Sequence, residues 1–310
     1  MPTPRRAALL LLILTALLYA PTLRYDWVYE DQNDLETFFS SERTAGNRWV
    51  TVGTYRLSHA ISGVQPWGYH LVSVAEHLGN GALLGTLLPA TGAGVVGLAL
   101  FLFHPLQVES VAYVSNRADV VMTTCLLLAL IGARHRQWAM VLIAAVGCVL
   151  AKESGVMALP LVAWFVWRRG QWPRSAWVGL LATALMAGWA IGRWMPTIDL
   201  GWTVTEVTKT LWYLTRLLWP FGLSIEQDWT WITPQIALIG TVLAIGMAWR
   251  CRRSVVAWPM GFVVLALLPR LGIPLYEGLH AHHFYLPMVG ISLGVGWMTQ
   301  KVSYESDPLL

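Results

Sequence analysis

Long apolar runs follow one another along nearly the whole chain, and this feature limits the possible folds most. Ten runs are present, at residues 7–23, 69–89, 92–103, 120–133, 137–151, 154–167, 176–192, 232–249, 255–268 and 284–299. A helix that crosses a membrane needs about 20 mainly apolar residues, so the shorter runs are expected to extend into their flanking motifs. The runs predict an all-α integral membrane protein, in which residues 1–310 form a single bundle of about ten or eleven transmembrane helices.

Composition excludes a soluble fold. Only 12% of the residues are charged and 56% are hydrophobic, whereas about a quarter of the residues in soluble domains are charged. The longest polar interval, residues 24–68, is too short to bury a core of its own, so no soluble domain is predicted. The net charge of +4 comes from short arginine clusters beside apolar runs, a pattern of cytoplasmic loops and not of a nucleic-acid surface. Membrane lipids are therefore expected partners, and nucleic acid is not.

The basic clusters predict how the chain threads the membrane. These clusters are Arg5 and Arg6, Arg134 and Arg136, Arg168, Arg169 and Arg174, Arg250, Arg252 and Arg253, and Lys301. All of them fall on the cytoplasmic side if the N-terminus is cytoplasmic and residues 205–223 lie at the membrane interface. If residues 205–223 crossed, the arginines at 250–253 would lie outside. The N-terminal run lacks a small-x-small exit, which favours an uncleaved first helix over a signal peptide.

Under this threading, four polar stretches share the outer side and are expected to carry short interfacial helices. They are residues 24–68 (first), 104–119 (second), 193–232 (third) and 269–283 (last). The compact loops favour a bacterial inner membrane, with the active face in the periplasm. The sequence thus gathers its candidate chemistry on the side opposite the N-terminus.

The first outer stretch opens with the acidic motif YDWVYEDQNDLE, which includes Glu30 and Asp31. Partial burial against helix ends raises the pKa of a carboxylate and makes it a better acceptor for a hydroxyl proton. The acids of this stretch, among them Glu30 and Asp31, are therefore candidate general bases. The alternative is a solvated acidic loop.

The second outer stretch reads HPLQVESVAYVSNRAD and contains His104, Glu109, Arg117 and Asp119. Ionisable residues so close to hydrocarbon are costly, which makes a functional site the first hypothesis. The alternative is a structural ion pair between Arg117 and either Asp119 or Glu109.

Lysine, arginine and histidine recur at two further helix junctions. AKESG contributes Lys152 and Glu153, and PRLGIPLYEGLHAHHFYLP contributes Arg270, His282, His283 and Tyr285. An ammonium or guanidinium group there can bind a phosphate, while plain interfacial packing is the alternative. A divalent metal on the histidines and Glu277 is not favoured, because the spacing matches no standard zinc pattern. The three cysteines indicate neither a disulfide framework nor a metal site.

Several of these motifs together resemble one family, the transmembrane and tetratricopeptide repeat-containing O-mannosyltransferases and their bacterial relatives. The similar segments are WVYEDQNDL, WGYHLVSVAEHLGNGALL, HPLQVESVAYVSNRADVV, AKESGVMALPLV, WYLTRLLWPFGLSIEQDW and GIPLYEGLHAHHFYLPMVG. They occur in the family's order and extend over nearly the whole chain. Each segment alone matches the family only loosely, but the set of segments in this order is specific to the family.

The resemblance implies a GT-C glycosyltransferase fold and a polyprenyl-phosphate sugar as donor, with no certain cofactor. It implies transfer to a protein or glycan hydroxyl with inversion, an outer-loop acid as base and basic residues on the departing phosphate. The family's motifs fall on Glu30, Asp31, His104, Glu109, Arg117, Asp119, Lys152, Glu153, His282, His283 and Tyr285.

Three departures from the family pattern bear on these roles. Glu30 stands where the family commonly has aspartate, so the resemblance implies Asp31 as the base, supported by Glu30 and Glu109. His282 and His283 replace the family's usual Glu-Arg, which puts a phosphate-binding arginine in doubt. The sequence ends at SYESDPLL without a repeat domain, which implies different acceptor recognition or a partner membrane subunit. The alternative is a non-catalytic GT-C-derived structural subunit of a larger membrane complex.

Overall fold

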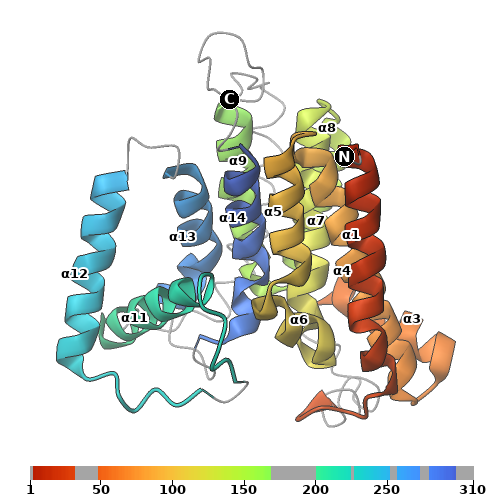
Figure 1. The fold of residues 1–310 in the computed structure, drawn as a ribbon, viewed down its shortest axis with the longest axis horizontal. Coiled ribbons are helices and arrows are strands. Elements are labelled where there is room, and N and C mark those ends of the chain that lie inside the picture. Colours follow the sequence, from red (N-terminus) through yellow and green to blue (C-terminus); the bar gives the residue numbers. More distant parts are fainter. Residues whose placement is uncertain are drawn as a thin grey trace.

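The computed structural model describes residues 3–31, 48–168, 200–224, 227–251, 257–272 and 279–297. Throughout these residues the chain is helical and contains no strand (Figure 1). The α-helices are α1 (Pro4–Tyr19), α3 (Trp49–Ser62), α4 (Pro66–Leu87), α5 (Gly92–Phe103), α6 (Val108–Ala112), α7 (Arg117–Arg134), α8 (Trp138–Ala151), α9 (Ala158–Arg168), α11 (Leu200–Arg216), α12 (Pro234–Cys251), α13 (Ala257–Gly272) and α14 (Tyr285–Trp297). Short 3-10 helices are η1 (Ala20–Arg24), η2 (Pro105–Gln107), η3 (Val114–Asn116), η4 (Glu153–Met157) and η5 (Ala281–Phe284).

The predicted apolar runs coincide with helices, apart from residues 176–192, which lie outside the described residues. As expected, some helices extend beyond their runs into the flanking motifs. Helix α4 begins at Pro66, whose fixed φ and missing N–H suit a first helical position. Helix α7 begins at Arg117, inside the predicted second outer stretch.

Two helical segments are long and apolar enough to cross a membrane, Pro4–Arg24 and Val114–Arg134. A third candidate is the pair Gly92–Phe103 and Pro105–Ala112, which is bent by 44° between its two parts. Four further apolar helices are shorter, at Trp138–Ala151, Glu153–Ala163, Pro234–Met247 and Pro259–Leu271. The all-α membrane fold is therefore confirmed, and the number of crossings stays a prediction.

Helix α11 lies across the bundle instead of along it (Figure 1). It runs below α13 and beside the lower part of α12, and it packs against both. This crosswise course is the orientation that the sequence required of residues 205–223 if they lie at a membrane interface. Helices α3 and α6 lie at the same end of the molecule as α11, and the start of α1 lies at the other end (Figure 1).

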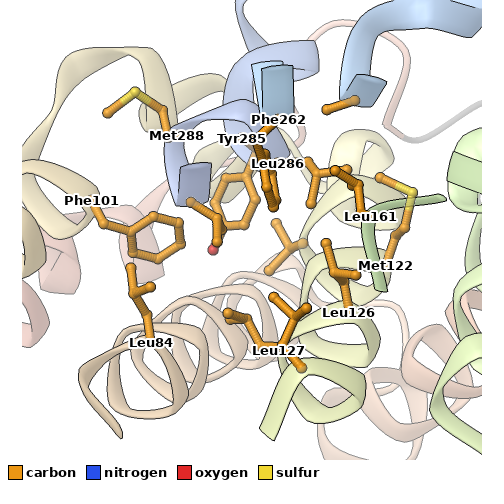
Figure 2. Packing of buried hydrophobic residues seen from close by; sticks show 14 of the residues in the cluster. Leu84, Phe101, Met122, Leu126, Leu127, Leu161, Phe262, Tyr285, Leu286 and Met288 are labelled. Atoms are coloured by element: carbon orange, nitrogen blue, oxygen red, sulfur yellow. The ribbon is translucent and has the colours of Figure 1, made fainter. Parts of the chain in front are cut away.

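The apolar core is built by α4, α5, α7, α9, α13 and α14 around Leu84, Phe101, Leu126, Leu127 and Tyr285 (Figure 2). Helices α5 and α14 approach very closely at one point. A Cβ atom added to Gly97 would lie 2.4 Å from the carbonyl oxygen of Ser292, so only glycine fits there. This contact fixes α14, and with it the chain that leads into α14, against the middle of the bundle.

Candidate active site

Contacts between distant segments gather the predicted outer stretches at one end of the bundle. Asp31 of the first stretch contacts Ser115 of the second, and Glu109 of the second contacts His282 near the start of α14. The third stretch joins through Tyr213 on α11, whose ring centroid lies 5.0 Å from that of Phe284 in η5. The predicted convergence of outer residues is therefore present in the described part of the chain.

Asp31 is fully buried, and its carboxylate accepts hydrogen bonds from backbone N–H groups. Its Oδ1 atom accepts the N–H of Ser115 at 2.8 Å, and Oδ2 accepts those of Val28 at 3.1 Å and Val114 at 3.4 Å. Burial raises the pKa of Asp31, and these hydrogen bonds oppose the rise. A carboxylate held in this way joins the first and second outer stretches. The geometry favours a structural role for Asp31 over the predicted role as general base.

Replacing Asp31 with Asn is expected to lower the free energy of unfolding by about 1–3 kcal/mol, because an amide nitrogen then faces backbone donors. Thermal unfolding of the purified protein in detergent measures this loss. Asp26 is the matched control, since its side chain is exposed and accepts only the N–H of Trp27. Equal stability of the Asp31→Asn and Asp26→Asn variants would contradict the structural role.

Glu109 and His282 form the shortest contact between the second and last stretches. The Oε1 atom of Glu109 lies 2.5 Å from Nδ1 of His282, and both side chains are less than 10% exposed. Glu109 sits in the first turn of α6, and its Oε1 also accepts Nδ2–H of Asn116 at 3.2 Å. The Ser110 hydroxyl donates to the carbonyl oxygen of His282 at 3.2 Å and anchors η5 to α6.

His283 lies against His282, with ring centroids 3.8 Å apart. Its Nδ1 atom accepts the backbone N–H of His280 at 3.1 Å, which caps the start of η5. Its Nε2 atom is buried and has no hydrogen-bond partner among the described residues. The two rings therefore occupy one confined place at the outer end of α14.

Three cations surround the two histidines. Burial lowers the pKa of His282 well below its ordinary value, and the charges of Lys152, Arg270, His280 and Arg48 lower it further. The pKa of His283 is lowered by burial and then by His282, Arg270, Lys152 and His280. We call Arg48, Lys152 and Arg270 the cationic cluster. The cationic cluster lies close enough to His282 to affect its charge, and lysine and arginine are side chains that bind phosphate groups in proteins.

Two members of the cationic cluster also contact acids. Lys152 Nζ lies 2.6 Å from Asp119 Oδ2, and both side chains are nearly fully buried. Arg48 forms a fork with Glu153 at 2.8–3.1 Å, in which both side chains are about 40% exposed. The predicted ion pairs of Arg117 with Asp119 or Glu109 are therefore wrong, because each acid has another partner.

Arg117 lies inside the protein, where its guanidinium group binds side-chain and backbone oxygens. Nε donates to Ser73 Oγ at 3.0 Å, and Nη1 donates to Ser58 Oγ at 2.9 Å. Nη2 donates to the Tyr69 carbonyl at 2.6 Å, and the group stacks over the Tyr55 ring at 4.7 Å. Arg117 thus links α3, α4 and α7, and this position does not support its predicted contact with a substrate phosphate.

The remaining predicted site residues are Tyr285, Glu30 and His104. Tyr285 is fully buried in the apolar core, where its hydroxyl contacts His77 Nδ1 at 2.7 Å and Asn80 Nδ2 at 3.2 Å (Figure 2). Glu30 is exposed. His104 begins η2, and its Nδ1 accepts the N–H of Leu106 at 3.2 Å. These positions favour packing and capping over substrate binding.

Sequence reasoning missed Arg48, although it lies within the predicted first outer stretch. Its signal was a lone arginine just before an apolar helix, and nothing in the sequence linked it to Glu153, which lies 105 residues away. Within the described residues, no group of three metal-binding side chains is present.

Comparison with known proteins identifies relatives in one family of curated proteins. Protein O-mannosyl-transferase Tmtc1 of Drosophila melanogaster is 34% identical over 125 residues, which cover 37% of this chain and 15% of the relative. Protein O-mannosyl-transferase tmtc2 of Xenopus laevis is 31% identical over 196 residues, covering 51% of this chain and 23% of the relative. Protein O-mannosyl-transferase TMTC2 of Homo sapiens is 35% identical over 127 residues, covering 36% and 15%.

Neither of the two other comparisons adds to this result. No family model matches the chain, and no solved structure matches it. The chain aligns with less than a quarter of the length of each of these relatives. The similarity over about two-fifths of the chain or more confirms the resemblance predicted from the motifs, which is to the transmembrane and tetratricopeptide repeat-containing O-mannosyltransferases.

Proposed function

We propose that this protein is a membrane glycosyltransferase of the GT-C type, which moves a sugar from a polyprenyl-phosphate donor to a protein hydroxyl. The observation that carries the proposal is the contact of Glu109 with His282 inside the cationic cluster. Glycosyl transfer needs a proton acceptor for the attacking hydroxyl and positive charge for the departing phosphate. The relatives' names, protein O-mannosyl-transferase, support the reaction class and a protein acceptor.

The proposed reaction is a single displacement. The acceptor oxygen attacks the anomeric carbon on the face opposite the phosphate, so the configuration inverts as the bond to the phosphate oxygen breaks. Arg270 and Lys152 stabilise the charge that develops on the phosphate in a partly desolvated site, where such interactions are strongest. Of the predicted acids, Glu109 is the one beside these cations, and Asp31 orders the loop that carries it.

The position of the site fits a lipid-linked donor. The cationic cluster lies near His282, which contacts Glu109 of α6, and α6 lies at the end of the molecule opposite the start of α1 (Figure 1). At the headgroup level of a membrane, the phosphate of a polyprenyl lipid would meet this end while its chain stays among the apolar helices. We further propose that this end faces the periplasm of a bacterial inner membrane, with the N-terminus in the cytoplasm.

Transfer of radiolabelled mannose from polyprenyl-phosphate mannose to serine- and threonine-containing peptides tests the proposal in proteoliposomes. Replacing Arg270 with Gln is expected to lower kcat about 100-fold, because one cation at the leaving phosphate is lost. Arg134→Gln is the matched control at the opposite end of the bundle, where Arg134 donates to the Thr86 carbonyl. Absence of transfer by the wild-type protein with mannosyl and other polyprenyl-phosphate sugar donors would refute the proposal.

The second candidate function is a non-catalytic structural subunit. It is favoured by one observation, the engagement of Lys152 with Asp119 and of Arg48 with Glu153. A protein of this kind would copurify with a stoichiometric membrane partner and carry no polyprenyl lipid. Mass spectrometry of the purified protein distinguishes the two functions, since the enzyme is expected to retain lipid-linked donor.

A further inference from the structure

We infer that the Nε2 atom of His282 takes the proton of the acceptor hydroxyl, while Glu109 positions the imidazole and His283 donates a hydrogen bond to the departing phosphate. This inference rests on the proposed glycosyl transfer and specifies how its acid and base groups are divided.

Hydrogen bonding at Nδ1 fixes the tautomer of His282. An ionised carboxylate only accepts hydrogen bonds, so the 2.5 Å contact with Glu109 Oε1 places the proton of the neutral ring on Nδ1. The Nε2 atom then carries the lone pair. Within the described residues it makes no hydrogen bond, and the Ser110 contact to the His282 carbonyl holds the backbone in place. A neutral imidazole oriented by a carboxylate is a common arrangement for accepting a hydroxyl proton.

His283 has the opposite arrangement. Its Nδ1 accepts the N–H of His280, so in the neutral ring the proton lies on Nε2. That Nε2–H is buried without a partner among the described residues, which leaves a donor for a ligand oxygen. Two rings with centroids 3.8 Å apart therefore supply one lone pair and one N–H. Transfer from a phosphate leaving group requires both.

Burial first, and then the surrounding charges, lower the pKa of His282 and favour the neutral ring. The groups that face it are Glu109 from α6, His280 and His283 from η5, Lys152 before η4, Arg270 from α13, and Arg48 before α3. While the site holds no donor, the cations disfavour a positive charge on the His282 ring. A donor phosphate offsets these cations, so binding of the substrate makes His282 a stronger proton acceptor.

The proposed step is balanced in atoms and charge. The acceptor oxygen forms a bond with the anomeric carbon, and the bond from that carbon to the phosphate oxygen breaks, leaving its electron pair on the phosphate. The hydroxyl proton moves to Nε2 of His282, and Glu109 stabilises the resulting imidazolium. Release of this proton to water restores the neutral ring after the glycoside and the polyprenyl phosphate leave.

Kinetics of the His282→Ala variant in proteoliposomes tests the inference. We expect kcat of the variant to fall about 10²–10⁴-fold. Added imidazole is expected to raise the rate of the variant at least about tenfold. His135→Ala, at the exposed end of α7 on the opposite side, is the matched control. The kcat/KM of the wild type, which reports the free enzyme, is expected to hold its plateau through neutral pH and to fall only at acidic pH, since the pKa of His282 lies well below its ordinary value.

Histidine nitrogen NMR of the wild-type protein gives a second readout that needs no activity. At pH 7.5, His282 is expected to be neutral and protonated at Nδ1, and Glu109→Gln is expected to increase the Nε2–H tautomer. A charged or Nε2–H form in the wild type would overturn the inference, as would His282→Ala with kcat within threefold of wild type or without imidazole rescue. An inactive wild type refutes the proposed function itself, whereas an active wild type with an unaffected His282→Ala variant refutes only this assignment.

Discussion

Replacing Asp119 with Leu is expected to lower the free energy of unfolding by about 3–5 kcal/mol, because it leaves the Lys152 ammonium buried without a counterion. The two groups are 2.6 Å apart, and their side chains are only 5% and 9% exposed. Breaking such a pair costs far more than losing an exposed one, since water cannot solvate the remaining charge. Denaturation of the purified protein in mixed detergent micelles measures the change.

The double variant Asp119→Leu with Lys152→Met is the control for this prediction. Removing both charges together is expected to recover most of the lost stability, because no uncompensated ion remains in the protein. The same double variant should have low transferase activity, since Lys152 belongs to the cationic cluster. If the two single losses simply added, the pair would not be coupled in the way the structure describes.

Arg117→Met is expected to lower the free energy of unfolding by about 3–5 kcal/mol, because it removes a fully buried guanidinium that satisfies oxygens on two helices. Ser58, Ser73 and the Tyr69 carbonyl all lose a donor in this variant. Arg117→Lys should be almost as unstable. The three oxygens are bound by three different nitrogens of the planar guanidinium group, and a single ammonium group cannot contact all of them.

Arg134→Met is the matched control, because it replaces an arginine at the other end of the same helix. Its side chain makes an exposed contact with the Thr86 carbonyl, so the expected change is within about 0.5 kcal/mol. The same detergent denaturation assay compares the variants. Equal midpoints for Arg117→Met and Arg134→Met would contradict the structural role of Arg117.

Much of the fold could be predicted because membrane helices are encoded locally. Runs of apolar residues predict helices without information from the rest of the chain, and the basic residues beside them predict which ends lie together. Helix α5 follows its predicted run residue for residue, at 92–103. Helix α7 begins earlier than its run because charged residues of its first turn are buried against α3, α4 and the end of α8.

The site could be predicted only in part, because its pairings are not local. The sequence named Glu109 and His282, but their contact spans 173 residues and depends on how α6 packs against η5. Tyr285 was assigned to the site because the last motif of the family that the chain resembles falls on it. It is the first residue of α14, and its side chain lies in the core, where His77 and Asn80 contact its hydroxyl. Residue type indicated candidate chemistry, and packing decided which of these side chains lie together.

The contact of Gly97 with Ser292 ties the geometry of the outer end to the middle of the bundle. Helix α14 begins directly after η5, which carries the two histidines, so the position of η5 along the bundle depends on where α14 packs against α5. A methyl group at position 97 would collide with the carbonyl oxygen of Ser292 and displace α14. Both imidazole rings would then shift relative to Glu109, although position 97 is far from any reacting atom. Under the proposed function, a residue with no side chain and no contact with substrate would thus affect the reaction.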